Sequence, residues 1–488
     1  MKNLVNKFIT YSFGNVLQSA FSLLLLPLYL RYFSPSEYGA ISVLTVIQSF
    51  LVLVMSGGAV NGLIRLYFGV DGDRKKKLAG TTLTWYAATA IFGWCLLFFL
   101  ARPLSLAFFQ TDQHAPSFRL LAFVYLPAIM LNFAFYVLRL ESKAWLFVLF
   151  SLFNLLVDIG LKLYLIVIAK QGIDGYFLAG AISGAFTLAA MIPVVLRYVT
   201  PSLHTADLKQ LLRIGAPFIA SGCSMWTLDV SDRLLLARFS GEDAVGIYSL
   251  AYNFANLFGI VLATPVALLI DPFFFAHAGE KSDDENKLLL RRMLIYYGIA
   301  GGALYLVIAV GSGELLRLFT TSFGSQARYL EAVRLLPVIT LAPYMYFLAS
   351  QAGYSSLLIK RPEIVSVAFI VAAVVNVGLN LVVIPHFGAV GAALTTVIAY
   401  LVLGGLAYYW MERLFPVGYD WMKIARLAGY VALAFAAGWL VRFEQPLVSL
   451  FAKLATSLAI FGILSFSKNG LLTNDERRML MSKILRKA

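Results

Sequence analysis

The chain is a succession of long apolar runs, and these runs restrict its fold more than any other feature. Hydrophobic residues make up 60% of the 488 positions and charged residues 13%, whereas a soluble domain carries about 25% charged residues. A helix needs about 20 mostly apolar residues to cross a bilayer. Many runs reach that length, so we predict an all-α integral membrane protein with no sizeable soluble domain.

Fourteen predicted spans account for about two thirds of the chain. Their ranges are 8–30, 39–64, 79–101, 116–138, 145–168, 175–196, 212–237, 244–270, 289–311, 328–358, 363–385, 388–411, 422–441 and 447–467. Because the number is even, both termini lie on one side of the membrane. The first span is too long for the apolar part of a signal peptide and no small-residue cleavage site follows it, so we expect the mature protein to keep it.

The distribution of positive charge predicts the orientation. Lys and Arg outnumber Asp and Glu by 39 to 25, which gives a net charge of +14. Most of these cations lie in loops on the side of the termini, including the run from Arg74 to Lys77. Cytoplasmic loops are the ones enriched in Lys and Arg, so we predict that both termini are cytoplasmic. The positive charge therefore indicates topology and not nucleic-acid binding.

Three short segments of the first half recur in the second half, which indicates an internal duplication. The pairs are 32–39 with 238–246, 160–163 with 378–381, and 172–175 with 388–391. They divide the bundle into two six-helix lobes, residues 1–200 and 201–416, which share one orientation because each holds an even number of spans. We predict a pseudo-two-fold axis along the membrane normal and a cargo site where the lobes meet.

Two segments after the repeats have no partner in the first half. Residues 417–472 hold the last two spans and are expected to form an appended hairpin. Residues 473–488 form a cytoplasmic amphipathic tail, in which Thr473 and Glu476 have capping-box spacing before an apolar stripe flanked by cations. One interpretation is a helix on the membrane surface, and the other is a solvated tail that only supplies charge.

The fifth span carries ionisable residues at bilayer depth, where such residues are costly and often functional. Asn154, Asp158 and Lys162 are spaced four residues apart, so they share one helical face. An acid four residues before a lysine is the favourable order. Asn376 and Asn380 occupy the equivalent positions of the second copy, so only the first copy is charged. Either the charged pair contacts cargo or a coupling proton, or its members neutralise each other.

Polar side chains also line three further spans. They are Asn15 and Gln18 in the first span, Asp229, Asp232 and Arg233 in the seventh, and Asn253 and Asn256 in the eighth. Lipid cannot satisfy such groups, so we predict a wet cavity between the lobes. Helix–helix hydrogen bonding without a cavity is the alternative. Rows of amides and hydroxyls with few charges suit a cargo rich in hydroxyl groups.

Four arginines lie near span ends. Arg65 and Arg139 fall on the predicted cytoplasmic side, and Arg31 and Arg233 fall toward the outer side. The guanidinium group matches phosphate oxygens, so the first two are candidate contacts for a phosphate-bearing lipid on entry and the other two on exit. The alternative is that they fix the topology and extend to the interface with their long side chains.

No arrangement of residues for catalysis or metal binding is visible. The sequence has no GxxxxGK[ST] loop, and its four histidines lie far apart in predicted loops. Cys95 and Cys223 both lie in apolar runs and predict neither a disulfide nor a metal site. We therefore expect no enzymatic activity, no cofactor and no metal.

Three groups of motifs carry a resemblance to a known family. They are residues 17–39, residues 232–236 with 245–251, and residues 376–380 with 384–393. As a set they resemble the bacterial polysaccharide flippases, the O-antigen and exopolysaccharide exporters of the multidrug/oligosaccharidyl-lipid/polysaccharide superfamily. The likeness covers roughly residues 1–415.

The resemblance implies transport of an oligosaccharide linked to undecaprenyl pyrophosphate. It implies movement from the cytoplasmic to the outer leaflet of the bacterial inner membrane, for O-antigen, capsule or exopolysaccharide synthesis, by two lobes that rock around a central cavity. Asp232 and Arg233 are the motif residues with obvious ligand chemistry. The implied partners are the lipid-linked oligosaccharide, membrane lipids, and a polymerase or other assembly proteins, with no nucleic acid.

Three alternative functions remain open. Lipid II flippases share the superfamily, but their usual amino-terminal signature is not visible in this chain. Cation-coupled multidrug antiporters of the superfamily typically rely on carboxylates in the amino-terminal lobe, where only Asp158 is available. A membrane enzyme such as a polysaccharide polymerase is the third, and the lack of a large outer loop weighs against it.

Overall fold

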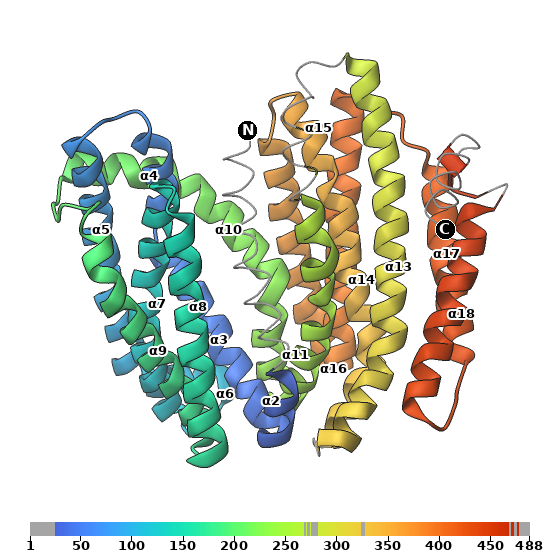
Figure 1. Ribbon diagram of the computed structural model, residues 1–488, viewed down its shortest axis with the longest axis horizontal. Coiled ribbons are helices and arrows are strands. Elements are labelled where there is room, and N and C mark those ends of the chain that lie inside the picture. Colours follow the sequence, from blue (N-terminus) through green and yellow to red (C-terminus); the bar gives the residue numbers. More distant parts are fainter. Residues whose placement is uncertain are drawn as a thin grey trace. The chain divides into compact units, whose positions relative to one another are not determined.

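The computed structural model describes residues 25–267, 270, 274, 282–323, 327–467, 470–472 and 476–477 (Figure 1). Regular structure in these residues is helical throughout, without a strand. The α-helices are α2 (Leu26–Tyr32), α3 (Pro35–Met55), α4 (Ala59–Tyr67), α5 (Asp73–Phe99), α6 (Ala101–Phe109), α7 (Ala115–Leu140), α8 (Ala144–Lys162), α9 (Gly172–Val195), α10 (Thr205–Ser240), α11 (Glu242–Ala255), α13 (Asp283–Phe323), α14 (Ala332–Ser350), α15 (Ala352–Leu358), α16 (Glu363–Leu414), α17 (Trp421–Leu440) and α18 (Pro446–Phe466). Two π-helical segments, η1 (Leu163–Ile168) and η2 (Gly259–Ala263), and a 3-10 segment, η3 (Ala327–Glu331), adjoin them. The predicted all-α class is confirmed.

Eleven helical segments of the described chain are long and apolar enough to cross a bilayer. The other three predicted spans differ from them for separate reasons. Most of the span predicted at 8–30, with Asn15 and Gln18, lies outside the described residues, as does most of the tail predicted at 473–488. The span predicted at 212–237 is helical, as part of α10, but too polar to count by hydropathy. The spans predicted at 363–385 and 388–411 are joined in α16, which is broken at Gly388 (φ 52°, ψ −134°).

The span predicted at 39–64 is interrupted, and this part of the prediction is wrong. Helix α3 ends at Met55, and α4 begins only after Gly57 and Gly58, whose φ angles are 62° and 64°. This left-handed conformation is unfavourable for residues with a Cβ. A Cβ on Gly58 would also lie 2.3 Å from the carbonyl oxygen of Gly215 on α10. The break therefore lets two helix backbones come into direct contact.

Contacts divide the chain into two units, Met1–Ser249 with Val377–Ala389, and Leu250–Asn376 with Val390–Ala488. In the first unit, α7 packs against α5 and α9, α8 against α9, and α10 against α3 and α4. In the second unit, α13 packs against α14, α17 and α18, and α17 packs against α18. Helix α10 and the first turns of α11 thus group with the first unit, while the predicted lobe boundary at residue 200 stays a prediction.

Small residues let α7 pack closely against its neighbours in the first unit. A Cβ on Gly93 of α5 would lie 2.4 Å from the ring of Tyr125, and one on Gly184 of α9 would lie 3.1 Å from Pro127. Tyr125 is fully buried, and its hydroxyl donates to the carbonyl oxygen of Thr89 at 3.2 Å. The core of this unit is therefore centred on α7.

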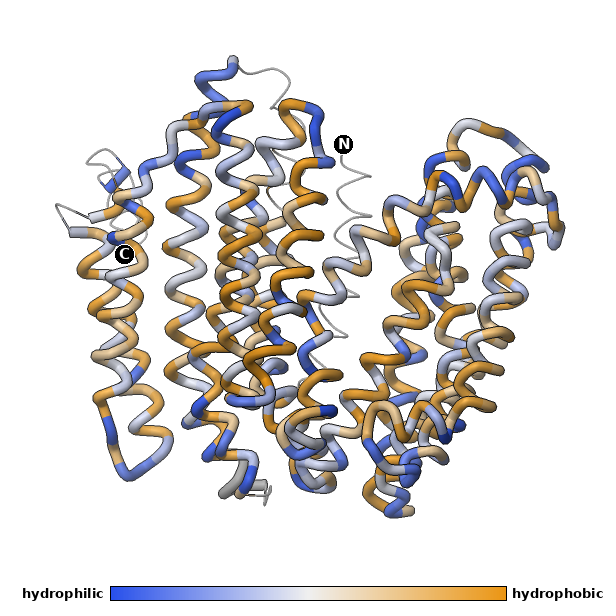
Figure 2. The backbone as a smooth tube through the Cα atoms, turned by 180° about the vertical axis from the view of Figure 1, so that it is seen from behind, coloured by the Kyte–Doolittle hydropathy of each residue, from blue (hydrophilic) through white to orange (hydrophobic). Residues whose placement is uncertain are grey.

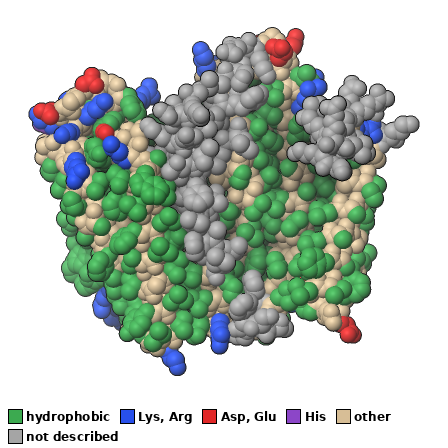
Figure 3. All heavy atoms as spheres, in the orientation of Figure 1, with side chains coloured by type: hydrophobic (Ala, Val, Ile, Leu, Met, Phe, Trp, Pro, Cys, Tyr) green, Lys and Arg blue, Asp and Glu red, His purple; other side chains and the backbone are tan. Residues whose placement is uncertain are grey.

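Apolar residues occupy the middle of the helices, and charged residues gather toward their ends. Figure 2 shows this as long orange stretches that give way to blue near the turns. On the face drawn in Figure 3, apolar side chains cover the sides of the helices, and Lys, Arg, Asp and Glu side chains lie near the ends. This distribution is the one expected of helices that cross a bilayer.

Candidate functional site

The first pair of repeated segments forms two helix starts in the first unit. Ser34 caps α3 with a complete capping box, in which its hydroxyl accepts from the Glu37 backbone N–H at 3.2 Å. The Glu37 carboxylate accepts in return from the Ser34 backbone N–H at 2.8 Å. The equivalent segment starts α11 at Glu242, directly after Gly241. Both copies therefore use the repeated motif to begin a helix.

The two helix starts contact each other symmetrically through the last glycine of each motif. A Cβ on Gly39 would lie 2.0 Å from the carbonyl oxygen of Glu242, and one on Gly246 would lie 1.9 Å from that of Pro35. Counting back from the two glycines makes Pro35 the counterpart of Glu242. Each copy thus presses its glycine against the same backbone position of the other copy. Only glycine leaves room for this approach.

A pair of equivalent serines hydrogen-bonds one turn further along. The hydroxyls of Ser42 and Ser249, three residues after the two glycines, are 2.7 Å apart. A residue that bonds to its own counterpart lies on a local two-fold axis. The duplication predicted from the sequence is therefore visible as a self-matched contact between α3 and α11.

Glu242 breaks this symmetry, because its counterpart is a proline. One carboxylate oxygen accepts from the Ser36 hydroxyl at 2.8 Å. The other lies 2.8 Å from Nε2 of His114, a buried residue just before α7. Glu242 thus joins α3, α11 and the segment between α6 and α7. Sequence reasoning did not single out this triad, because its members are distant in sequence and the repeat indicates equivalence but not contact.

Asp232, the motif residue with predicted ligand chemistry, is almost wholly buried, with 1% exposure. It lies on α10, and its carboxylate accepts a short hydrogen bond from the Tyr248 hydroxyl of α11. Arg233 is half-buried and Asp229 is exposed. Within the first unit, the described structure therefore connects Asp232 directly to the helix that carries the repeated motif.

The polar face predicted on the fifth span is present, and its members are paired. The Lys162 ammonium lies 2.7 Å from Asp158 and 4.1 Å from the ring centroid of Tyr176. From α9, the hydroxyl of Ser183 donates to Asp158 at 3.4 Å. These contacts are consistent with internal neutralisation, although a role in coupling stays a prediction. Asn154 accepts a 3.0 Å hydrogen bond from another α9 hydroxyl and extends the same face.

The three remaining candidate arginines lie on three different helices. Arg31, Arg65 and Arg139 belong to α2, α4 and α7, and all three are exposed. The Arg139 guanidinium lies 4.6 Å from the ring centroid of Phe147. Within the described residues none of the three forms an ion pair. Asn253 and Asn256 belong to the second unit, where Asn253 is half-buried and Asn256 is exposed at the end of α11.

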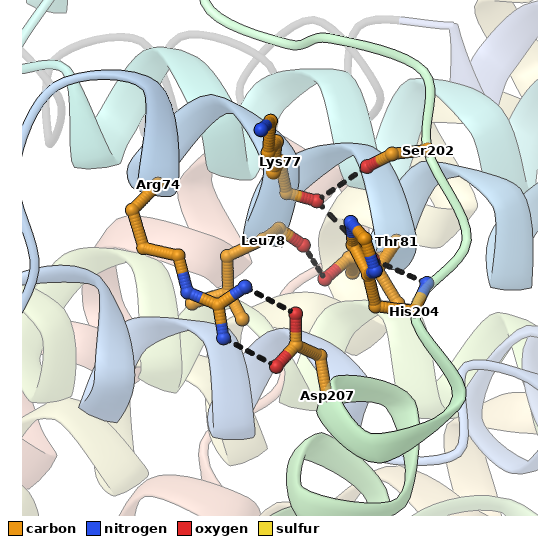
Figure 4. Close-up of polar contacts among 8 residues, drawn as sticks. Arg74, Lys77, Leu78, Thr81, Ser202, His204 and Asp207 are labelled. Atoms are coloured by element: carbon orange, nitrogen blue, oxygen red, sulfur yellow. Dashed lines mark hydrogen bonds and ion pairs between the residues drawn. The ribbon is translucent and has the colours of Figure 1, made fainter.

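A second polar cluster fastens the segment between α9 and α10 to the start of α5 (Figure 4). Arg74 forms two hydrogen bonds to Asp207, at 2.8 and 2.5 Å. The Ser202 hydroxyl donates to the Lys77 carbonyl oxygen at 2.9 Å, and the His204 backbone N–H donates to a threonine hydroxyl of α5 at 3.3 Å. The predicted orientation treated these cations as topology signals, so it did not indicate this contact.

The second unit contains a buried ion pair that links α13 to the appended hairpin. The Lys453 ammonium of α18 lies 2.6 Å from Glu314, and the Ser449 hydroxyl donates to the same carboxylate at 3.1 Å. Glu314 is 2% exposed. The sequence places Lys453 within a span, but Glu314 lies beyond the predicted end of its own span at 311. The pair was therefore not predicted.

Comparisons with known proteins agree on the kind of protein. A family described as "Polysaccharide biosynthesis protein" matches residues 29–300. A probable multidrug resistance protein NorM of Caulobacter vibrioides is 29% identical over 205 residues, which are 40% of this chain and 41% of the relative. A probable flippase AglR of Haloferax volcanii is 30% identical over 179 residues, or 36% of each chain. The chain thus matches about two fifths of the length of these curated relatives.

Solved structures extend the likeness to nearly the whole fold. The lipid II flippase MurJ, in an inward closed conformation, superimposes with a TM-score of 0.75 at 15% identity, covering 93% of this chain and 98% of that one. An inward-facing multidrug resistance MATE transporter superimposes with a TM-score of 0.65 at 16% identity, covering 86% and 96%. At such low identity the likeness concerns the fold alone.

Proposed function

Because the chain belongs to the polysaccharide biosynthesis protein family, within the multidrug/oligosaccharidyl-lipid/polysaccharide superfamily, we propose that it is a lipid-linked oligosaccharide flippase. Its cargo would be an oligosaccharide on undecaprenyl pyrophosphate, moved from the cytoplasmic to the outer leaflet of the bacterial inner membrane. The observation that carries this proposal is the family match, which covers more than half of the chain. A polymerase or other assembly protein would use the translocated unit.

The self-matched contact between α3 and α11 supports alternating access. It holds the repeats together through two glycines, one serine pair and the Glu242 carboxylate. Hydrogen bonds of this kind each contribute about 1 kcal/mol, so breaking them costs only a few kcal/mol of stability. Charge distribution in the sequence predicts that this end of the first unit faces outward. We infer that the contact is the outer seal of the transport path.

Buried Asp232 and the other candidate residues predicted from the sequence supply the chemistry for cargo in this proposal. Arg233 offers a guanidinium group to the pyrophosphate, with Arg65 and Arg139 on the entry side and Arg31 on the exit side. Asp229, Asn253 and Asn256 offer acceptors and donors to sugar hydroxyls. Opening of the seal would separate α3 from α11 and so change the surroundings of Tyr248, the partner of Asp232.

Leaflet accessibility in proteoliposomes tests the proposal. Fluorescent undecaprenyl-pyrophosphate oligosaccharide is incorporated, and an impermeant sugar-modifying reagent reports its transfer. Wild type is compared with Arg233→Ala and Asp232→Ala, and with Arg426→Ala, an exposed arginine of α17, as the matched control. The proposal requires rapid transfer by wild type and the control. No transfer by wild type above protein-free vesicles would refute it.

A cation-coupled multidrug antiporter is the second candidate function. Asp158 within the first unit favours it, because an ionisable residue inside a membrane span is typical of proton relays and ion pathways. This reading predicts that an imposed proton gradient drives uptake of a small organic cation and that Asp158→Asn abolishes it. The same vesicles with lipid II as cargo test the third candidate, a lipid II flippase.

A further inference from the structure

Two apolar grooves in the second unit meet at the end of α16. The larger has a volume of about 580 Å³ and is enclosed by α13, α14, α16 and α17. The smaller has a volume of about 320 Å³ and lies between the first turns of α16 and its last turns. Arg413 is the residue that lines both grooves. A single cation thus stands at the junction of two apolar spaces.

The larger groove has the length of one membrane leaflet. It extends along α16 from Tyr400 to Arg413, which is about 20 Å at about 1.5 Å per residue. One leaflet contributes about half of the roughly 30 Å hydrocarbon core. Leu401 and Tyr409 are both more than half exposed along this path. Trp421, an aromatic residue typical of the membrane interface, lines the groove near its charged end.

Arg413 is available to an external anion. It is exposed, its guanidinium carbon lies 4.5 Å from the ring centroid of Tyr409, and it forms no ion pair within the described part of the chain. The carboxylate of the neighbouring Glu412 accepts instead from the backbone N–H groups of Val417 and Gly418. Glu412 is therefore occupied with the turn that follows α16, and does not neutralise the arginine.

The surrounding charge is also positive. Lys360 and Arg361 are exposed directly before α16 and form no ion pairs within the described residues. The acidic residue that lines the smaller groove, Glu363, lies in the first turn of α16, where a carboxylate interacts favourably with the helix dipole. Basic pockets between membrane helices are typical sites for anionic lipid headgroups.

We propose that the two grooves bind one anionic diacyl phospholipid, with its phosphate on Arg413 and an acyl chain in each groove. Two apolar grooves that share one cation match a lipid with two chains and one phosphate. A polyprenyl lipid has a single chain and would leave one groove empty. None of the residues that line the two grooves belongs to α10 or α11, so we assign the bound lipid as a resident of the transporter and not as its cargo.

Tyr408 shows what such a lipid would hold together. Its hydroxyl donates to the Leu348 carbonyl oxygen of α14 at 2.7 Å, and its ring packs edge-on against Trp421 of α17. The larger groove lies over this junction. A chain in the groove would fill the space between α14, α16 and the appended hairpin, and so stabilise the hairpin against the rest of the unit.

Lipid retention by the purified full-length protein, measured by native mass spectrometry with phosphatidylglycerol as the probe, tests the proposal. Arg413→Gln removes the phosphate contact, and Arg426→Gln on α17 is its matched control. Gly405→Leu fills the larger groove, because a Cβ at Gly405 meets nothing within 4 Å. Gly462→Leu on α18, where a Cβ also meets nothing, is the second control.

The expected result is one tightly retained phosphatidylglycerol per chain. Arg413→Gln and Gly405→Leu should each weaken retention about tenfold, the effect of losing a charge-assisted contact or a buried chain. Both controls should match wild type. Equal retention by Arg413→Gln and wild type would overturn the proposal. Displacement of the phospholipid by an equimolar amount of undecaprenyl phosphate would overturn it as well and assign the grooves to cargo, whatever the outcome of the transport assay.

Discussion

A disulfide across the self-matched contact should stop transport. The hydroxyls of Ser42 and Ser249 are 2.7 Å apart, and a disulfide joins two sulfur atoms at about 2.05 Å. Cysteine sulfurs placed at the two hydroxyl positions would lie about 0.7 Å beyond bonding distance. The substitutions Ser42→Cys and Ser249→Cys are made in a chain whose two free cysteines, Cys95 and Cys223, are serines.

The expected loss of transport rate follows from the strength of the disulfide bond that replaces the serine pair. The serine pair contributes about 1 kcal/mol and opens readily, whereas a covalent bond does not open on the timescale of transport. The residual rate should therefore equal the fraction of protein that is not crosslinked. Reducing agent should restore the rate, and each single cysteine variant should transport at the rate of the cysteine-free chain with and without oxidant.

Crosslinking is quantified by the mass of a proteolytic fragment that contains both cysteines, and transport by the leaflet-accessibility assay. Transport should fall as the crosslinked fraction rises, and it should recover as reducing agent lowers that fraction. A fully crosslinked protein that transports at the unmodified rate would refute this expectation, because the contact would then stay closed throughout the cycle. Failure to crosslink under oxidation would contradict the contact itself.

Three further outcomes follow from the same structure. Gly246→Ala puts a methyl group 1.9 Å from a backbone oxygen. This overpacking should destabilise the contact between α3 and α11 by about 1–3 kcal/mol, and the disulfide described above should therefore form more slowly. Lys453→Met removes the ammonium 2.6 Å from buried Glu314 and leaves the Arg317 guanidinium, 3.6 Å away, so it should lower stability by about 1–3 kcal/mol, less than for a buried charge with no partner left. Unfolding in detergent should show most of the loss recovered when Glu314→Gln is added. Asp207→Asn removes the charge that holds Arg74, which should cost about 1 kcal/mol of local stability. Hydrogen exchange of the backbone between α9 and α10 should therefore become about fivefold faster, whereas exchange in α7 should keep the wild-type rate.

The helical class and the duplication could be predicted from the sequence because both depend on local patterns. Apolar runs of span length form helices whatever surrounds them. The motif around Gly39 recurs around Gly246 and can be recognised in the sequence itself. The break at Gly57 and Gly58 escaped prediction, since two glycines in an apolar run fit a helix as well as a turn. The contact with Gly215, which requires the break, is visible only in the folded chain.

The candidate site likewise contains contacts that a local sequence pattern predicts and contacts that only the folded structure reveals. Asp158 and Lys162 were predicted as a pair because their spacing in one helix places them together, and they lie 2.7 Å apart. His114 and Glu242 are as close, at 2.8 Å, but His114 precedes α7 and Glu242 begins α11, so no periodicity connects them. A sequence pattern reveals partners within a helix, whereas partners between helices depend on packing geometry.

The contact between α3 and α11 has the geometry of an isologous dimer interface, in which one surface patch meets its own copy. An ancestor with a single copy of the motif would have joined two separate chains through the same glycine and serine, and one substitution would have altered both sides at once. Fusion removed that restriction. Glu242 faces Ser36 and His114 while its counterpart is Pro35, an asymmetry open to a fused chain and closed to a homodimer.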